Sequence, residues 1–393
     1  MTGGKAKAAD GGAVLVLNAG SSSIKFAVFG ADLKERLAGA VTEIGGEAAL
    51  AVNGVSALCS AANHGEALDA VMAVLAEKGD GVAGLAGAGH RVVHGGARLT
   101  AATEVTPRVR AEIEACSPLA PLHNPHNLAA IDAVAAAAPD LRQFASFDTS
   151  FHATNPEEAT RYAIPDSPET EGIRRYGFHG LSYASLVLNL PPVSGEPLPH
   201  RLLAFHLGNG ASLCAIRNGK SRATTMGYSP LDGLTMGTRC GGIDANAVLT
   251  LVERHGVDKV KALLNNQSGL LGLSGGKSDM RKLMTDHSAS SAFAIEHFCY
   301  WSVRHAGSLI AAMGGLDAIA FTGGIGEHAL GVRLRILQGV AWAGVVVDAD
   351  ANHRREARLH AQTSKVAVWV VQAEEEKMIA RDAFSLMRTE PLA

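Results

Sequence analysis

The stretch VLVLNAGSSSIKFAVF, residues 14–29, contains two apolar segments on either side of a polar turn. Residues 14–17 are continuously apolar, which is typical of a strand buried on both faces. From Ile24 to Val28, apolar residues alternate with Lys25 and Ala27, as they do in a half-buried strand. The pattern therefore predicts a β-hairpin whose turn spans residues 18–23.

The chemistry of this turn suits phosphate, although an ordinary serine-rich turn is the alternative. A glycine, three serines and Asn18 lie in it and Lys25 follows, so N–H groups, hydroxyls and a cation are close together. The segment LLAFHLGNGASLCAI, residues 202–216, repeats the arrangement. Gly20 and Gly210 lie 190 positions apart in a chain of 393. Two such hairpins at half-length spacing predict a duplicated fold that holds a nucleotide.

Composition bounds the class of protein. A chain of 393 residues, 47% hydrophobic and 19% charged, predicts two globular domains. The net charge of −3 gives no electrostatic reason to expect a nucleic-acid or membrane partner. Five scattered cysteines without a CxxC pair are typical of reduced thiols in a cytoplasmic protein.

The start of the chain and its apolar runs show no targeting pattern. No run reaches the eighteen or so apolar residues that a membrane span needs. Residues 1–12 contain two lysines but no apolar segment behind them, which predicts a disordered leader and not a signal peptide.

Two charged residues are expected at strand ends. Arg91 lies in GAGHRVVHGG, residues 87–96, where a glycine-flanked arginine favours an anion site over a plain surface role. Asp148 follows a short apolar strand in FASFDTSFHAT, residues 144–154, where a cleft-facing carboxylate and a turn aspartate are equally good interpretations. His90 and His94 stand four apart, but the strand-like valines and the lack of a third ligand argue against zinc.

Several other segments give coarser expectations. PLAPLHNPHN, residues 118–127, is predicted as a loop before an alanine-rich helix at 128–138, and residues 190–200 as a surface loop. AIAFTGGIGE, residues 318–327, predicts a buried strand that opens into a glycine turn suited to a nucleoside. GGKS, residues 275–278, lacks the first P-loop glycine and a preceding strand, so a Walker A site is excluded.

Acidic residues 374–376 open a predicted helix that runs to about residue 387. The helix dipole alone favours acids there, and Mg²⁺ binding is the alternative.

In order, the chain reads NAGSSSIKF, GHRVVHGG, PLHNPHN, FDTSFH, YGFHG, HLGNGAS, GYSPLDGLTMGTR, SDMR, FTGGIGE and EEKMIARD. Together these motifs resemble the acetate kinase family, within the superfamily that holds actin, the hexokinases and the heat-shock chaperone ATPases. The resemblance covers residues 14 to about 382. It implies an α/β, duplicated ribonuclease-H-like fold, with two domains around a nucleotide cleft, and a homodimer. The implied domains are residues 13–152 with 376–393, and residues 153–375 for nucleotide binding and dimerisation.

The resemblance implies reversible, ATP-dependent phosphorylation of acetate, with Mg²⁺, or Mn²⁺ in its place, and with ATP or ADP as co-substrate. The implied catalytic residues are Arg91, Asp148, His179 and Arg239, and Asn18 and Glu375 are implied to organise the metal. The implied substrate pocket is Arg91, Val93, Leu122, Phe178 and Pro230. The residues implied to bind ATP are Ser21, Ser23, Lys25, His206, Leu207, Gly208, Asn209, Gly210, Asp279, Met280, Arg281, Gly324, Ile325, Gly326, Glu327 and His328.

The chain departs from the family's usual pattern at four positions. Gly242 and Ala245 stand where aspartate and proline are common, and His328 and Glu374 each replace an asparagine. Propionate and butyrate kinases share the implied site, and Val93 is expected to favour acetate. A non-catalytic ATP-binding regulator and, through His328, a variant that uses ADP or pyrophosphate are the other hypotheses.

Overall fold

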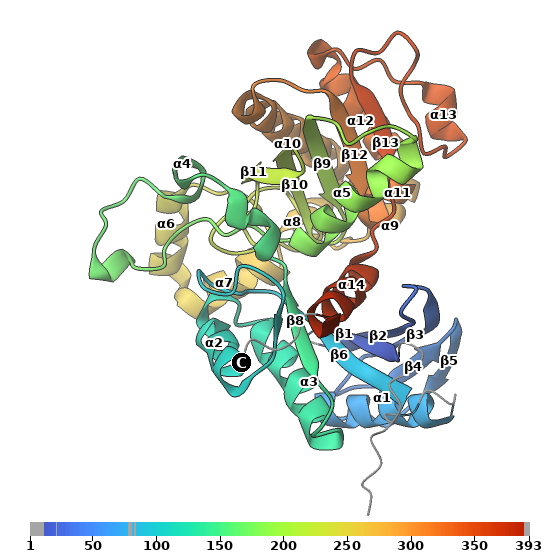
Figure 1. The fold of residues 1–393 in the computed structure, drawn as a ribbon. Coiled ribbons are helices and arrows are strands. Elements are labelled where there is room, and N and C mark those ends of the chain that lie inside the picture. The colour runs from blue at the N-terminus through green and yellow to red at the C-terminus, as the bar shows by residue number, and fades with distance from the viewer. Residues whose placement is uncertain (1–11, 21, 78–80, 82–83, 389–393) are drawn as a thin grey trace, which may run out of the picture. The chain divides into compact units, whose positions relative to one another are not determined.

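The computed structural model describes residues 12–20, 22–77, 81 and 84–388. The described residues form two compact units (Figure 1). Unit 1 contains those up to Ser150 and those from Glu374 onward, and unit 2 is Phe151–Ala373. The boundaries expected from the sequence lie at 152–153 and 375–376. Of the expected leader, residues 1–11 lie outside the described residues.

Unit 1 is built on a sheet whose eight described strands have the order β5-β4-β3-β2-β1-β6-β8-β7. These strands are β1 (Ala13–Ala19), β2 (Ser23–Phe29), β3 (Glu35–Thr42), β4 (Ala49–Val52), β5 (Val55–Leu58), β6 (Leu85–Val92), β7 (Thr103–Glu104) and β8 (Gln143–Phe147). β1 to β5 pair antiparallel in sequence order, whereas β1, β6 and β8 run parallel. The predicted first hairpin is confirmed, because β1 pairs with β2 from Val14–Phe29 to Ala19–Ile24.

Helices cover both faces of this sheet (Figure 1). The helices of unit 1 are α1 (His64–Glu77), α2 (Pro107–Ala115), α3 (Asn124–Ala137) and α14 (Glu375–Arg388). α1 and α3 bury Val71 and Val134 against Leu15 and Leu17 of β1. α14 packs on the opposite face, against β1, β6 and β8.

Unit 2 contains a second sheet in the order β11-β10-β9-β12-β13. Its strands are β9 (Arg201–Leu207), β10 (Ala211–Arg217), β11 (Lys220–Thr224), β12 (Ala318–Thr322) and β13 (Ala367–Val370). Its helices are α4 (Glu157–Thr160), α5 (Gly180–Ser194), α6 (Ala245–His255), α7 (Val257–Asn266), α8 (Gly269–Ser274), α9 (Met280–Thr285), α10 (Ala289–Met313), α11 (Gly323–His328), α12 (Leu330–Gly339) and α13 (Ala349–His353). α5 packs on the sheet through Leu186 and Leu190, which contact a core that includes Leu202 and Ala320.

The two sheets share one topology. In unit 1, β3-β2-β1 are antiparallel and β1-β6-β8 are parallel; in unit 2, β11-β10-β9 and β9-β12-β13 repeat these directions. The second predicted hairpin, β9–β10, therefore occupies the same place in its sheet as the first. The α/β class and the duplication predicted from the sequence are confirmed.

Two helix boundaries predicted from the sequence are wrong. α3 begins at Asn124 and not at residue 128, because Pro125 occupies the first turn, where its missing N–H costs nothing. α5 continues through Pro191 and Pro192 to Ser194, so the first five residues of the predicted 190–200 loop are helical and residues 195–200 are not. The helix ends at Gly195, whose φ of 72° suits a glycine cap. The glycine turn predicted after β12 is the first turn of α11.

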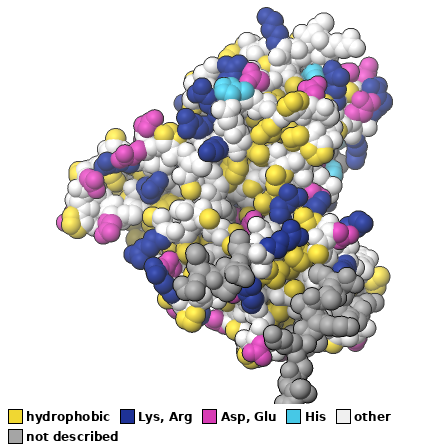
Figure 2. All heavy atoms as spheres, in the orientation of Figure 1, with side chains coloured by type: hydrophobic (Ala, Val, Ile, Leu, Met, Phe, Trp, Pro, Cys, Tyr) yellow, Lys and Arg dark blue, Asp and Glu magenta, His cyan; other side chains and the backbone are white. Residues whose placement is uncertain are grey.

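Within the described part of the chain, no helix combines the length and the apolar character that a membrane span requires. On the face shown in Figure 2, basic and acidic side chains are interspersed.

Candidate active site

Three polar side chains of unit 1 come from the carboxyl ends of neighbouring parallel strands. Asn18 is near the end of β1, Arg91 near the end of β6, and Asp148 follows β8 directly. Side chains alternate between the faces of a strand. Because Gly89 of β6 lies against Ile379 of α14, Arg91, two residues further on, points to the same face as α14. The crevice outside the carboxyl ends of such strands is where ligands bind in open α/β sheets.

These side chains form a connected network. Arg91 Nε donates to Asp148 Oδ1 at 3.0 Å, and its Nη2 donates to Oδ2 at 2.6 Å. Its Nη1 donates to Asn18 Oδ1 at 3.2 Å. Only 2% of the Asp148 side chain is exposed, against 23% of Arg91. Burial by itself lowers the pKa of Arg91, but the charge and hydrogen bonds of Asp148 outweigh burial and raise that pKa above its usual range.

Glu375, the first residue of α14, adds a second carboxylate beside this network. Burial is the main cause that raises the pKa of Glu375 to about 7. The charges of Asp148 and Glu376 raise it further, whereas Arg91 and Lys25 lower it. The ionised form of Glu375 is therefore short of compensating positive charge.

The phosphate-type turn lies between β1 and β2. Gly20 N–H donates to Ser23 O at 2.7 Å, and Lys25 is exposed on β2. His64 Nε2 of α1 donates to Gly20 O at 2.7 Å, so the turn is anchored to a helix. Ser21 lies outside the described residues.

The two apolar pocket residues expected in unit 1 have different surroundings. Val93, which follows β6, is 4% exposed, whereas Leu122, before α3, is 49% exposed.

Asn124 and Asn127 of α3 hold the backbone around Val93 through their side chains. Neither of these roles was predicted from the sequence. Their spacing of three, in PLHNPHN, was the signal that both face one side of a helix.

Unit 2 brings together a pair of histidines. His179 and His206 stack with ring centroids 4.1 Å apart. Their Nδ1 atoms hydrogen-bond to Ser212 and Ser182, at 2.9 and 2.8 Å respectively. His179 has a φ of 59°, a left-handed conformation that is unusual for histidine and common at functional sites. Neither serine was identified from the sequence.

The glycine-rich turn after β9 lies beside this pair. A Cβ at Gly210 would be 3.1 Å from His179 Nε2 and 3.8 Å from Arg239 Nη1. Gly237 N–H donates to Asn209 O at 2.9 Å. Arg239 Nη1 also donates to Pro230 O, at 3.4 Å. Five predicted site residues of unit 2, namely His179, His206, Gly210, Pro230 and Arg239, are therefore connected.

Other predicted residues support this cluster or lie at its edge. Phe178, which is 1% exposed, accepts a hydrogen bond from His152 Nε2 through its carbonyl group. Leu207 is fully buried at the end of β9, and Gly208 N–H donates to Gly210 O at 2.9 Å.

The expected nucleoside segment includes α11. Gly323 has a φ of 78°, and a Cβ there would meet the Leu207 carbonyl at 2.8 Å, so glycine is required. Gly324 borders open space, Ile325 is half-buried and Gly326 is buried. Glu327 Oε1 accepts from Gly323 N–H at 2.9 Å and from Ala373 N–H at 3.0 Å. The Glu327 carboxylate is thus engaged with backbone groups.

The segment at α9 is held by a local ion pair. Asp279 accepts from the Arg281 N–H at 2.8 Å, and Arg281 Nη2 lies 2.6 Å from Asp279 Oδ2. The Arg281 hydrogen bonds lower the pKa of Asp279 to about 2. Met280 between them is buried, whereas the Arg281 side chain is exposed.

The four residues that depart from the family pattern are at exposed positions, at the start of a helix or in a local ion pair. Gly242 is exposed and Ala245 begins α6. His328 is exposed at the end of α11. Glu374 pairs with Lys377 at 3.2 Å, so its added charge is compensated locally.

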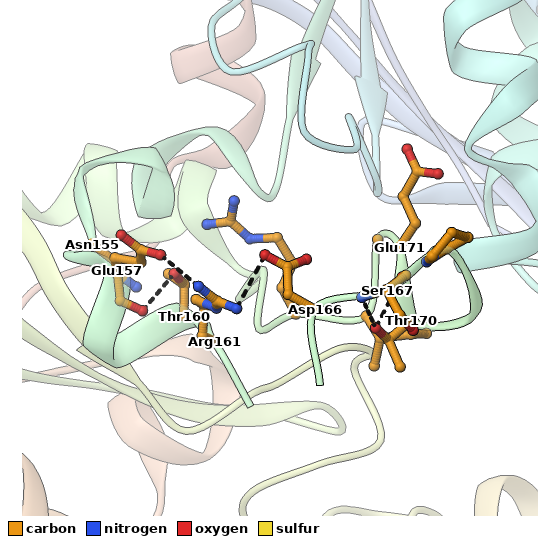
Figure 3. Close-up of a pocket in the computed structure, with 12 residues that line it drawn as sticks. Asn155, Glu157, Thr160, Arg161, Asp166, Ser167, Thr170 and Glu171 are labelled. Atoms are coloured by element: carbon orange, nitrogen blue, oxygen red, sulfur yellow. Dashed lines mark hydrogen bonds and ion pairs between the residues drawn. The ribbon is translucent and has the colours of Figure 1, made fainter. Parts of the chain in front are cut away.

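A separate polar cavity of about 810 Å³ lies in residues 155–174 of unit 2 (Figure 3). Arg161 crosses it, paired with Glu157 at 3.1 Å and Asp166 at 3.3 Å. Within the described chain, Asn155 Oδ1 and Arg174 Nε are buried without a hydrogen-bond partner. None of the twelve lining residues is one that the sequence predicts for the site.

His90 and His94 do not form a metal pair. His90 Nε2 hydrogen-bonds to Gln143 at 2.7 Å, and His94 Nδ1 accepts from Gly96 N–H at 2.9 Å. Among the residues that the structure describes, no group of three or more His, Cys, Asp or Glu side chains is placed to hold a metal.

A sequence profile of the Acetokinase family matches residues 13–381. This chain belongs to the acetokinase family. The acetate kinase of Rhodopseudomonas palustris (strain TIE-1) is 45% identical over 390 residues, which cover 95% of this chain and 98% of that protein. The acetate kinase of Clostridium botulinum (strain Loch Maree / Type A3) is 39% identical, with coverages of 94% and 98%. The resemblance deduced from the ordered motifs is therefore confirmed.

Solved structures of the family agree with the fold. Acetate kinase from Porphyromonas gingivalis is 35% identical, with a TM-score of 0.88 over 96% of this chain and 100% of that chain. A propionate kinase from Francisella tularensis subsp. tularensis SCHU S4 is 33% identical, with a TM-score of 0.89 over 94% and 98%.

The buried histidines beside Arg91 make folding sensitive to acid. Burial lowers the pKa of both His90 and His94 to about 4, below the ordinary value near 6.5. Between these pH values the histidines of the unfolded chain bind protons that those of the folded chain do not, so the stability that the two histidines contribute is full above pH ~6.5 and falls toward pH ~4. We expect each histidine to contribute about 3 kcal/mol to this loss.

Urea unfolding between pH 7 and 4.5 measures this dependence. His90→Gln is expected to reduce the slope of stability against pH by about one proton. His255→Gln, at an exposed position, is the control and should leave the slope unchanged. An equal slope in His90→Gln and in the wild type contradicts the assignment of a neutral, buried His90. The comparison with the variant is needed because the raised pKa of Glu375 changes stability in the opposite direction over the same pH range.

Proposed function

We propose that this chain transfers the γ-phosphoryl group of ATP directly, and reversibly, to the carboxylate of acetate, forming acetyl phosphate. The observation that carries the proposal is the buried Arg91–Asp148 pair, bound to Asn18 at the ends of parallel strands, in a member of the acetokinase family. The acetate kinase names of its full-length relatives support the same substrate.

Acetate needs no general base. Carboxylic acids of this kind ionise near pH ~4, so acetate is already an anionic nucleophile at neutral pH. Both carboxylate oxygens of Asp148 accept hydrogen bonds from Arg91. We therefore assign Asp148 the role of orienting Arg91, and not of removing a proton.

The site must also stabilise the negative charge of the phosphoryl group during transfer. The transferred phosphoryl group carries charge on its equatorial oxygens, and preorganised donors stabilise it. Arg91 is held rigid by Asp148. In unit 2, His179 is oriented by Ser212, and Arg239 is tied to the carbonyl of Pro230. We assign these three side chains to the phosphoryl group that is transferred.

The residues of unit 1 fit a hard divalent cation. Asn18, Asp148 and Glu375 supply amide and carboxylate oxygens, the donors that Mg²⁺ prefers, and Mn²⁺ accepts the same set. The raised pKa of Glu375 fits a carboxylate whose charge a cation would balance. Asn18 and Glu375 would hold Mg²⁺, through water where it keeps its shell, and the ion would neutralise charge on the phosphates of ATP.

We assign ATP binding to both units. In unit 1, Ser21, Ser23 and Lys25 would face the phosphates. In unit 2, the turn at Asn209 and Gly210 lies beside His206 and would bring backbone N–H groups to the phosphates. The segments at Met280 and at Gly324–Gly326 would contact the nucleoside. Because the Glu327 carboxylate is occupied by backbone groups, we assign it to holding α11.

Substrate choice depends on the buried Val93. A valine at this position shortens the acyl pocket and favours acetate over propionate, the substrate named for one structural relative. A regulator that binds ATP without turnover is less well supported, because it would not need the Arg91–Asp148 pair.

We also propose a cytoplasmic homodimer. All five cysteines are free thiols, as in a reducing compartment. α10 carries an aromatic stripe, defined as Phe293, His297, Tyr300 and Trp301, of which Phe293 and Tyr300 are 55% and 61% exposed. His297, Trp301 and Ile243 line one cavity of about 360 Å³. Exposed apolar surface of this kind favours a protein partner.

Removing the Arg91 side chain is expected to lower kcat for acetate by about 10²–10³-fold, because one preorganised charge is lost. Asp148→Asn should also lose most activity, since an amide cannot accept both Arg91 hydrogen bonds. Acyl phosphate trapped as its hydroxamate measures both. Arg110→Ala, a surface arginine paired with Asp132, is the control. Near-normal turnover by Asp148→Asn, or a trapped phosphoenzyme, would refute direct transfer with an orienting carboxylate.

Val93→Ala is expected to raise kcat/KM for propionate relative to acetate by roughly tenfold, because one methylene is worth about 1–3 kcal/mol in an apolar pocket. The ratio is measured with the two acids under MgATP. Val92→Ala removes the same methyl groups in the core that β6 shares with α3, and should leave the ratio unchanged. Equal efficiency of the wild type on butyrate would contradict a short pocket.

The dimer is tested by sedimentation of the purified chain. The wild type is expected at twice the mass of 40.7 kDa, and Tyr300→Glu is expected to shift it toward the monomer. Leu58→Glu, at an 83% exposed position of β5, is the matched control. A wild type that sediments as a monomer refutes the proposal.

A further inference from the structure

We propose that Asn127 is a positioning residue that sets the separation between the phosphate-binding hairpin and the acyl pocket. The proposal rests on the proposed function for the identity of the two substrates. Its structural part concerns unit 1 alone and is testable by itself.

The ladder between β1 and β6 stops short of the site. The two strands pair in parallel from Ala13–Leu85 to Leu17–His90. Beyond that point the Asn127 side chain joins the two chains. Val93 N–H donates to Asn127 Oδ1 at 3.1 Å, and Asn127 Nδ2 donates to Ala19 O at 2.8 Å.

The Asn127 amide therefore continues the ladder across a wider gap. It supplies one acceptor and one donor, as a backbone peptide group would. Asn127 is only 1% exposed, so water does not replace these bonds. The strands are held apart by the width of a side-chain amide at the edge of the sheet where ligands bind.

The two groups that Asn127 joins belong to different parts of the reaction. Ala19 follows Asn18, which we assign to the metal and phosphates. Val93 lies two residues beyond Arg91 and limits the acyl pocket. In-line transfer needs the nucleophile and the γ-phosphoryl group at a fixed separation, to which rate is sensitive on the scale of 1 Å.

Neighbouring residues of α3 support this role. His126 stacks on His64 with centroids 4.7 Å apart, and His64 Nε2 donates to Gly20 O at 2.7 Å. The turn is thus tied to α1 and α3 at consecutive carbonyl groups. Among the described residues, the hydrogen bonds of Asn124 go to His94 and α2: its Oδ1 accepts from His94 N–H at 3.1 Å, and its Nδ2 donates to His94 O at 3.0 Å and to Ile113 O at 3.4 Å.

Asn127→Asp tests the proposal because it keeps an acceptor for Val93 and loses the donor to Ala19. We expect kcat/KM for acetate to fall at least tenfold and the propionate-to-acetate ratio to change at least threefold. KM for MgATP should change less. Asn124→Asp is the matched control: it is equally buried on the same helix turn, but does not touch the hairpin. It should lower the melting temperature similarly without speeding hydrogen exchange in the hairpin, because its hydrogen bonds reach His94 and Ile113.

Hydrogen–deuterium exchange of the whole chain without substrates gives a second readout. Amides of residues 18–20 and 22–25 should exchange faster in Asn127→Asp than in Asn124→Asp. A folded Asn127→Asp with wild-type exchange and a wild-type ratio would overturn the proposal. If the aspartate variant does not fold, Asn127→Ser is used in its place, because serine is too short to bridge Val93 N–H and Ala19 O. A wild type inactive on acetate, with the expected exchange difference, would refute the proposed function and not the positioning role.

Discussion

The buried Arg91–Asp148 ion pair is the constraint on which the architecture of unit 1 depends. A charge pair with one nearly inaccessible partner is tolerated only when its geometry is good and its remaining hydrogen-bonding groups are satisfied. Arg91 meets this requirement by using three nitrogens on two partners. Arg91 can reach both partners only because the carboxyl ends of β1, β6 and β8 lie side by side in the sheet. The parallel register of these strands and the α14 face above them therefore serve to assemble one charged network.

The duplicated topology places different chemistry at equivalent positions. In unit 1, the ends of the central strands carry charged and amide side chains. In unit 2, the equivalent ends carry a glycine turn, a stacked histidine pair and the first turn of α11. Both use the same physical principle, since the carboxyl ends of parallel strands leave backbone and side-chain groups free to meet a ligand. The specialisation lies in the residues, because the five strands that the two sheets share have the same order and directions.

Local patterns were enough to predict both hairpins, the strands that end at Arg91 and Asp148, and the helix after Glu374. They decided these elements because apolar runs, alternation and glycine turns are short-range signals. Contacts between residues far apart in the chain could not be predicted from local patterns. Asn127 and Ala19 are separated by 108 positions, so nothing in PLHNPHN indicated its partner. The start of α3 and the end of α5 were misjudged for another reason: proline is tolerated in a first turn, and burial of Leu186 and Leu190 outweighs the cost of the prolines in the last turn of α5.

The carboxylate of Glu327 couples the movement of α11 to that of a distant part of the chain. It binds the N–H of Gly323, at the start of α11, and the N–H of Ala373, the last residue of unit 2. Any displacement of α11 therefore pulls on the point at which the chain leaves one compact unit for the other. The two hydrogen bonds that Glu327 accepts are short and involve a carboxylate, so they couple the positions of Gly323 and Ala373 closely. The segment that we assign to the nucleoside, α11, is in this way coupled to Ala373, where the chain passes from unit 2 to unit 1.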